Sequence, residues 1–211
     1  ESARNFINKI WNASRFVLMN SEGKDFKKLE DIRLTYADKW ILSRLNNVVK
    51  EVTINLNKYE IGLATGKLYD FVWSDFCDWY IEATKPMLYG DNERAKLNAL
   101  TVLNFVLDEI LKLMHPFIPF VAEEIYQYKQ TGKCHALMMQ EWPKYNKKFN
   151  YYKEAKAFEG VMDIIKAIRN VRNEMQVAPS KKIKVYVKAG EHAAVVEKLS
   201  TYIEKMAGVG E

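Results

Sequence analysis

Apolar residues recur every three or four positions through the first 130 residues of the chain, with few helix breakers inside the repeats. This is the period of an amphipathic α-helix, because 3.6 residues per turn bring such positions onto one face. Lys85-Pro86 is expected to end the third helix, and Pro116 with Pro119 to separate the fourth from the fifth. The pattern predicts a helical bundle with helices at 3–18, 38–58, 61–84, 93–114 and 120–128.

The pattern changes after Trp142-Pro143, where lysine, asparagine and tyrosine become frequent. Residues 152–175 again have the period of a helix, and Pro179 prevents its continuation. Residues 182–188 alternate apolar and polar side chains, which is typical of a half-buried strand. A short helix is expected at 193–204.

A single strand is not stable alone, so its partner lies either beyond Glu211 or in the tail of the chain. We expect the strand to be an incompletely paired edge, in a domain cut inside a larger protein. The predicted fold class is mainly α: a helical domain at 1–148, followed by a partial, truncated α/β domain at 149–211.

The positive charge of the chain is concentrated in one segment. The 211 residues carry a net charge of +5, and residues 143–190 contain twelve Lys or Arg against four Asp or Glu, which gives +8 there and −3 elsewhere. Such a segment can face a polyanion, although a lysine-rich face that contacts only water is the commoner case.

Sequence motifs for catalysis, metal binding and membrane insertion are missing. The chain has no Gly-rich phosphate loop, nucleophile elbow, zinc-protease motif or Glu-x-x-His pair, and its two cysteines, Cys77 and Cys134, form no C-x-x-C pair. No apolar run approaches the length of a membrane span. We therefore expect a cytoplasmic chain that binds no metal and catalyses nothing.

The first helix has a clear core face. At 100° per residue, one arc collects its large apolar residues. These are Phe6, Ile7, Ile10, Trp11, Ala13, Val17 and Leu18.

Phe16 lies outside that arc, in the middle of the opposite face. Its neighbours there are Asn5, Asn8, Lys9, Asn12 and Arg15. An aromatic ring among amides and cations suits single-stranded nucleotide recognition, where a ring stacks on a base, amides read its edge and cations bind phosphate. Alternatively, Phe16 packs beneath the loop of residues 20–36, and the pattern alone leaves both interpretations open.

Basic residues of the second segment lie on or beside an apolar stripe. Arg169 and Arg172 project there from the expected helix at 152–175, so each guanidinium needs a partner, either a buried carboxylate or a phosphate. Lys181 and Lys182 lie where the expected strand begins, and they are either a phosphate-binding pair or simply solvated.

Several longer motifs resemble a known family. Residues 8–16 read NKIWNASRF, 73–80 read WSDFCDWY before Lys85-Pro86, and 115–120 read HPFIPF before Glu123-Glu124. These motifs, over nearly the whole chain, closely resemble the C-terminal region of bacterial valyl-tRNA synthetases, which are class I aminoacyl-tRNA synthetases. The His-Pro and Glu-Glu pattern is shared with the isoleucine, leucine and methionine enzymes, whereas the first two motifs are similar to the valine enzymes.

The resemblance implies an anticodon-binding helical domain followed by the start of a stem-contact domain, both for valine tRNA. In the family the first helix approaches the anticodon loop, whose second and third letters are A and C for valine. The matching positions are Lys9, Asn12, Arg15 and Phe16, with Arg4 and Asn8 beside them. The implied stem contacts are Arg169, Arg172, Lys181 and Lys182.

The catalytic, editing and coiled-coil parts of a synthetase have no counterpart here. The resemblance therefore implies a monomeric tRNA-binding fragment without cofactors, which works with the remainder of the synthetase in cis, while ATP and Mg serve the whole enzyme. The alternative function is a helical protein-interaction domain whose basic segment docks an acidic partner protein.

Overall fold

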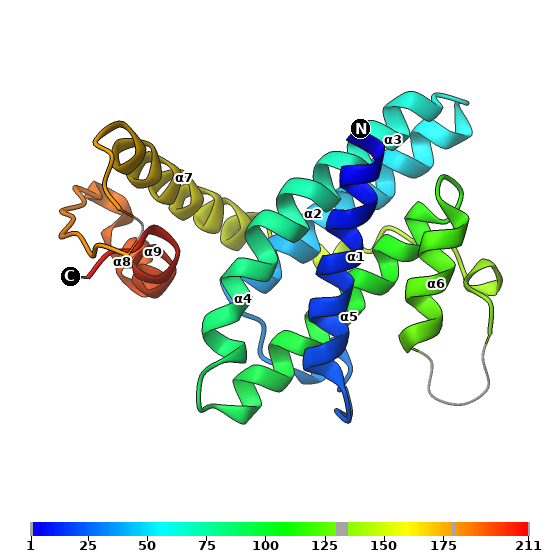
Figure 1. Cartoon of the computed structure of the whole chain (residues 1–211), viewed down its shortest axis with the longest axis horizontal. Helices are drawn as coiled ribbons and strands as arrows, with labels where there is room; N and C mark the ends of the chain where they lie inside the picture. The colour runs from blue at the N-terminus through cyan, green and yellow to red at the C-terminus, as the bar shows by residue number, and fades with distance from the viewer. Residues whose placement is uncertain (1, 130–134, 179, 211) are drawn as a thin grey trace. The chain divides into compact units, whose positions relative to one another are not determined.

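The computed structural model describes residues 2–129, 135–178 and 180–210 (Figure 1). Cys134 and Pro179 lie outside these residues. The chain divides into two compact units, Glu1–Tyr151 and Tyr152–Glu211, and each is described by itself. The boundary expected after residue 148 falls in the last turns of the first unit.

The first unit is the predicted helical bundle. Its helical elements are α1 (Ser2–Ser21), η1 (Leu29–Asp31), α2 (Tyr36–Asn57), α3 (Ile61–Asp70), η2 (Phe71–Tyr80), α4 (Ile81–Leu88), α5 (Glu93–Met114), α6 (Pro119–Lys129), η3 (Leu137–Met139) and η4 (Lys147–Phe149). Helix α5 packs against α1, α2, α4 and α6, and its inward face is completely buried. Helix α1 lies across α5 (Figure 1). One side of α1 is exposed.

The expected break at Lys85-Pro86 is wrong. Helical structure runs without interruption from α3 through η2 and α4 to Leu88, and the Tyr89 N–H still bonds to the Lys85 oxygen at 3.0 Å. A proline inside a helix costs about 3 kcal/mol. Burial of Ile81, Thr84 and Leu88 holds this turn in place despite that cost.

The segment η2 has the wider turns of a π-helix, in which each N–H bonds to the oxygen five residues earlier. The Ile81 N–H, for example, bonds to the Phe76 oxygen. The segment contains the DFCDWY motif and buries Phe71, Phe76, Cys77 and Tyr80. Burial raises the pKa of the Cys77 thiol to about 12, so this cysteine stays protonated near neutral pH.

Asp38 joins the start of α2 to η2. Its carboxylate accepts the Thr35 N–H while its own N–H donates to Thr35 Oγ1, and this pair of bonds forms a capping box. The carboxylate also accepts the Thr35 hydroxyl at 2.8 Å and the Tyr80 hydroxyl at 2.6 Å. Burial raises the pKa of Asp38, while the bonds from Tyr80 and Thr35 oppose that rise. This buried cluster fixes where α2 meets η2.

Residues 142–151 form a segment that runs along α2 at the end of the first unit, and we call this segment the strap. Asn46 donates to the Asn146 oxygen and to Asn150 Oδ1, both at 3.0 Å, and accepts the Asn146 N–H at 2.8 Å. The Ser43 hydroxyl donates to the Phe149 oxygen and accepts the Tyr151 N–H. Polar side chains of α2 therefore satisfy backbone groups of a segment whose regular structure is one short turn, η4.

The second unit contains α7 (Tyr152–Glu174), η5 (Gly190–His192), α8 (Ala193–Lys198) and α9 (Ser200–Ala207). Helix α7 packs on α9, where the rings of Phe158 and Tyr202 meet edge to face at 5.2 Å. The helix expected at 193–204 is divided at Leu199 into α8 and α9.

The expected α/β fold of this unit is wrong for the part of the chain that the structure describes. Residues 182–188 form no sheet, and Ile183 makes a single parallel bridge to Val209. The Gly210 N–H donates to the Ile183 oxygen at 2.9 Å. The tail thus supplies one partner residue, and among the described residues the strand pairing consists of this bridge.

Candidate nucleic-acid interface

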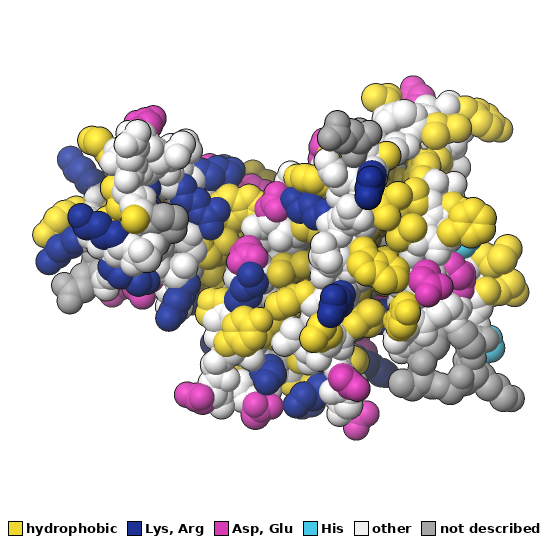
Figure 2. Space-filling view, in the orientation of Figure 1, with side chains coloured by type: hydrophobic (Ala, Val, Ile, Leu, Met, Phe, Trp, Pro, Cys, Tyr) yellow, Lys and Arg dark blue, Asp and Glu magenta, His cyan; other side chains and the backbone are white. Residues whose placement is uncertain are grey.

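The exposed side of α1 is a ridge of amides and guanidinium groups. Arg4, Asn8, Asn12 and Arg15 are all exposed, whereas Ile10, Ala13 and Val17 are buried beneath them. In Figure 2 basic side chains lie along α1 with apolar surface beside them. The division predicted from the helical period is confirmed for Asn8, Asn12, Arg15 and the three buried residues, and we call the four exposed side chains the α1 ridge.

Lys9 lies at one edge of the α1 ridge and contacts η2. Its Nζ is 2.6 Å from Asp78 Oδ1 and 3.8 Å from the centre of the Trp73 ring. The lysine side chain is 24% exposed, so the ion pair and the ring hold the ammonium close to the bundle. A phosphate that approaches Lys9 meets this ammonium together with the Asp78 charge.

Phe16 is half-buried on the same edge, and not in the middle of the exposed face as the helical period predicted. The Lys85 Nζ lies 6.0 Å from the centre of its ring and 2.6 Å from Glu82 Oε1. The structure therefore places Phe16 beside α4, where one part of the ring is covered and another part reaches solvent. A partly exposed ring next to a cation can still take a stacked base.

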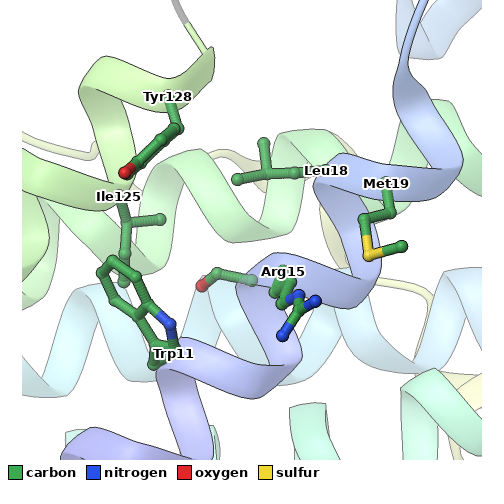
Figure 3. A pocket seen from close by; sticks show the side chains of 7 residues that line it. Trp11, Arg15, Leu18, Met19, Ile125 and Tyr128 are labelled. Atoms are coloured by element: carbon green, nitrogen blue, oxygen red, sulfur yellow. The ribbon is translucent and has the colours of Figure 1, made fainter.

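Trp11 is not a core residue as its place in the apolar arc predicted. It is 38% exposed at the other edge of the α1 ridge, and its ring meets Tyr128 of α6 edge to face at 6.2 Å. Figure 3 shows both rings on the same side of α1 as Leu18. Trp11 lies at the very end of the predicted apolar arc, next to Arg15. This position was the sequence feature that could have indicated an exposed ring.

The second unit carries its basic residues in two environments. The buried Arg172 guanidinium donates to the oxygens of Gly208, Ala178 and Lys181 at 3.2, 2.9 and 2.9 Å. These partners are backbone carbonyls. The sequence had predicted a carboxylate or a phosphate as the partner of Arg172, and carbonyls were not among the alternatives. Arg172 thereby holds the end of α9 to the segment after α7.

The other three basic residues lie at the surface of this unit. Arg169 is exposed and donates to the Met206 oxygen through Nε at 3.0 Å and through Nη2 at 2.8 Å. Lys181 and Lys182 are exposed. Figure 2 shows many Lys and Arg side chains over this unit, as the charge of residues 143–190 predicts.

The described residues offer neither a metal site nor a membrane span. Within the described ranges, no three His, Cys, Asp or Glu side chains are grouped so that they could hold a metal ion. Among the same residues, no helix combines the length and the apolar character that crossing a bilayer requires.

Comparison with known proteins gives a consistent match. Residues 38–187 match the family described as the anticodon-binding domain of tRNA ligase. The chain is 48% identical to a valine-tRNA ligase of Clostridium acetobutylicum, 47% to that of Clostridium perfringens and 44% to that of Bacillus anthracis, over 98 to 100% of this chain. In each case the match spans 24% of the relative, so the chain covers about a quarter of the length of these proteins.

Proposed function

Because the chain belongs to the family of anticodon-binding domains of tRNA ligases, we propose that it binds the anticodon loop of valine tRNA through the α1 ridge. The observation that carries this proposal is the row of exposed amides and guanidinium groups on α1, with a partly exposed aromatic ring on either edge. The identity of 44 to 48% to valine-tRNA ligases supports valine as the amino acid.

Each side chain of the α1 ridge has a chemical role in this proposal. Asn8 and Asn12 read base edges, because a carboxamide both donates and accepts hydrogen bonds. Arg4 and Arg15 bind phosphates, and the ring of Phe16 stacks on a base. Lys9 adds positive charge beside Phe16 while Asp78 and Trp73 hold its ammonium in place.

In this proposal the second unit binds the stem of the tRNA. Lys181, Lys182 and Arg169 contact phosphates from the surface, and Arg172 contributes through the backbone that it holds. Phosphate contacts of this kind position a nucleic acid without reading its sequence. Aminoacylation, which uses ATP and Mg, and a cytoplasmic location are proposed for a longer enzyme in which this chain supplies tRNA binding.

Changing one anticodon letter should distinguish tRNA recognition from a general basic docking surface. We expect the chain to bind unmodified valine tRNA about 5- to 150-fold more tightly than the same tRNA with its second or third letter replaced, because one well-formed base contact contributes roughly 1–3 kcal/mol. Fluorescence anisotropy at one fixed salt concentration measures both affinities. Equal affinities would favour the protein-interaction alternative, which predicts no discrimination between bases.

A second test concerns the lysine pair of the second unit. Replacing Lys181 and Lys182 by Glu should weaken all tRNAs about equally and flatten the dependence of log Kd on log salt, by roughly 0.9 for each phosphate that the lysines no longer neutralise. Lys27 and Lys28, another exposed pair, provide the matched control when they are replaced in the same way. If both double variants change the slope equally, the first pair contacts no phosphate and only adds net charge.

A further inference from the structure

An open pocket lies between α1 and α6, on the edge of the α1 ridge opposite Phe16 (Figure 3). Its volume is about 380 Å³, which is within the usual range for sites that bind small molecules. The residues that line it are Trp11, Ser14, Arg15, Leu18, Met19, Ile125 and Tyr128.

Large apolar side chains of this pocket are exposed to solvent. Tyr128 is 67% exposed and Met19 is 66% exposed, beside the 38% exposed Trp11. Exposed aromatic and thioether groups that are close together typically mark a surface that a partner covers. Arg15 lies next to them on the exposed side of α1, so a ligand in the pocket reaches a positive charge (Figure 3).

Ser14 adds a polar group with an unused hydrogen-bonding capacity. Its side chain is 1% exposed and lines the pocket, yet its Oγ has no hydrogen-bond partner among the residues that the structure describes. A buried hydroxyl without a partner is unfavourable, and such groups in folded proteins call for an explanation. A ligand that both stacks on the rings and bonds to this hydroxyl would supply one.

We propose that the pocket binds one unstacked base of the tRNA loop, and this proposal rests on the function proposed above. A nucleobase has a flat π face for Trp11 or Tyr128 and a polar edge for Ser14 Oγ, and its phosphate can pair with Arg15. A purely apolar protein side chain would fill the same space but would leave the hydroxyl without a partner. The loop would then straddle the α1 ridge, with one base seated beside Phe16 and another beside Trp11.

Replacing Trp11 by Ala should weaken binding of valine tRNA about tenfold, the effect of removing one stacked ring. The salt dependence of binding should not change, because stacking releases no counterions. Tyr128→Ala, at a more exposed position, should act in the same direction without loss of folding. Tyr59→Ala is the matched control, since Tyr59 is 89% exposed but does not line the pocket.

Abasic substitutions identify the base. Each nucleotide of the anticodon loop is made abasic in turn, and the affinity of each tRNA is measured with the unmodified chain and with Trp11→Ala. We expect one position at which the abasic change costs about tenfold with the unmodified chain and nothing further with Trp11→Ala. If the two losses multiply at every position, no base occupies the pocket.

Ser14→Ala tests the hydroxyl separately. It should weaken tRNA binding and leave the stability of the unbound chain unchanged or higher, because it removes a buried group that has no partner there. Unchanged tRNA affinity in Trp11→Ala, Tyr128→Ala and Ser14→Ala would overturn the pocket proposal. In that case the proposed function would still be supported if the unmodified chain discriminates between anticodon letters. If the unmodified chain binds these tRNAs equally, the proposed function is refuted.

Discussion

Replacing Ile10 by Ala should lower the free energy of unfolding of the first unit by roughly 2–5 kcal/mol, because buried apolar surface is removed and a cavity is left. Ile10 is 0% exposed at the centre of the packed side of α1. Urea denaturation followed by tryptophan fluorescence measures this change. All five tryptophans precede residue 152 and therefore report the first unit alone.

Phe16→Ala, on the other side of the same helix, should have the opposite profile. Valine tRNA should bind more weakly by roughly 1–3 kcal/mol, whereas the stability should change much less than in Ile10→Ala, because the Phe16 ring is already partly in solvent. Binding by Ile10→Ala is measured where that variant is still folded, and it should change less than binding by Phe16→Ala. If Phe16→Ala unfolds the unit as Ile10→Ala does, the ring is a core group and the proposed reading face is wrong.

The second large effect is expected at Arg172. Arg172→Met should destabilise the second unit by roughly 3–5 kcal/mol, since each hydrogen bond to a charged group contributes roughly 1.5–3 kcal/mol and such effects are not fully additive. Methionine keeps an unbranched apolar side chain, is shorter than arginine and donates no hydrogen bond, so the carbonyls of Ala178, Lys181 and Gly208 are left without this donor. Amide hydrogen exchange in α7 and α9 measures the destabilisation of this unit.

Arg169→Met is the matched control for Arg172→Met. Arg169 is exposed on the same helix, and its two described bonds go to one carbonyl, that of Met206. Water can replace those bonds, so this variant should change exchange protection by only about 1 kcal/mol. Equal protection in the two variants would mean that the buried guanidinium does not hold α9 in place.

The helices of the bundle could be predicted because local signals coincide there. The helix expected at 93–114 is found as α5 (Glu93–Met114), where an apolar period follows the cap at Asn92. Pro86 misled the prediction because burial of the neighbouring turn outweighs one missing backbone bond. Propensity describes a residue by itself, whereas the structure of α4 also depends on its packing against η2 and α5.

Other features depend on contacts that no local pattern contains. The strap at 142–151 has no period of its own, and its bonds to Asn46 join residues about a hundred positions apart. Alternation at 182–188 indicated a strand, but a strand also needs a neighbour, and only Val209 among the described residues provides one. Trp11 was assigned to the core because a helical wheel gives direction without showing how far the next helix reaches.

The π-helical turns of η2 set the rotational phase of α4. Each residue is rotated by about 100° around an α-helix axis, and the wider turns of a π-helix rotate each residue less, so they change which residues of α4 face inward. The observed phase buries Thr84 and Leu88 and brings the Lys85 ammonium to the ring of Phe16. Deleting one residue of η2, such as the exposed Ser74, would rotate α4 about its own axis by about a quarter turn. The length of the segment between α3 and α4 therefore determines the chemistry beside Phe16 as directly as the choice of side chains does.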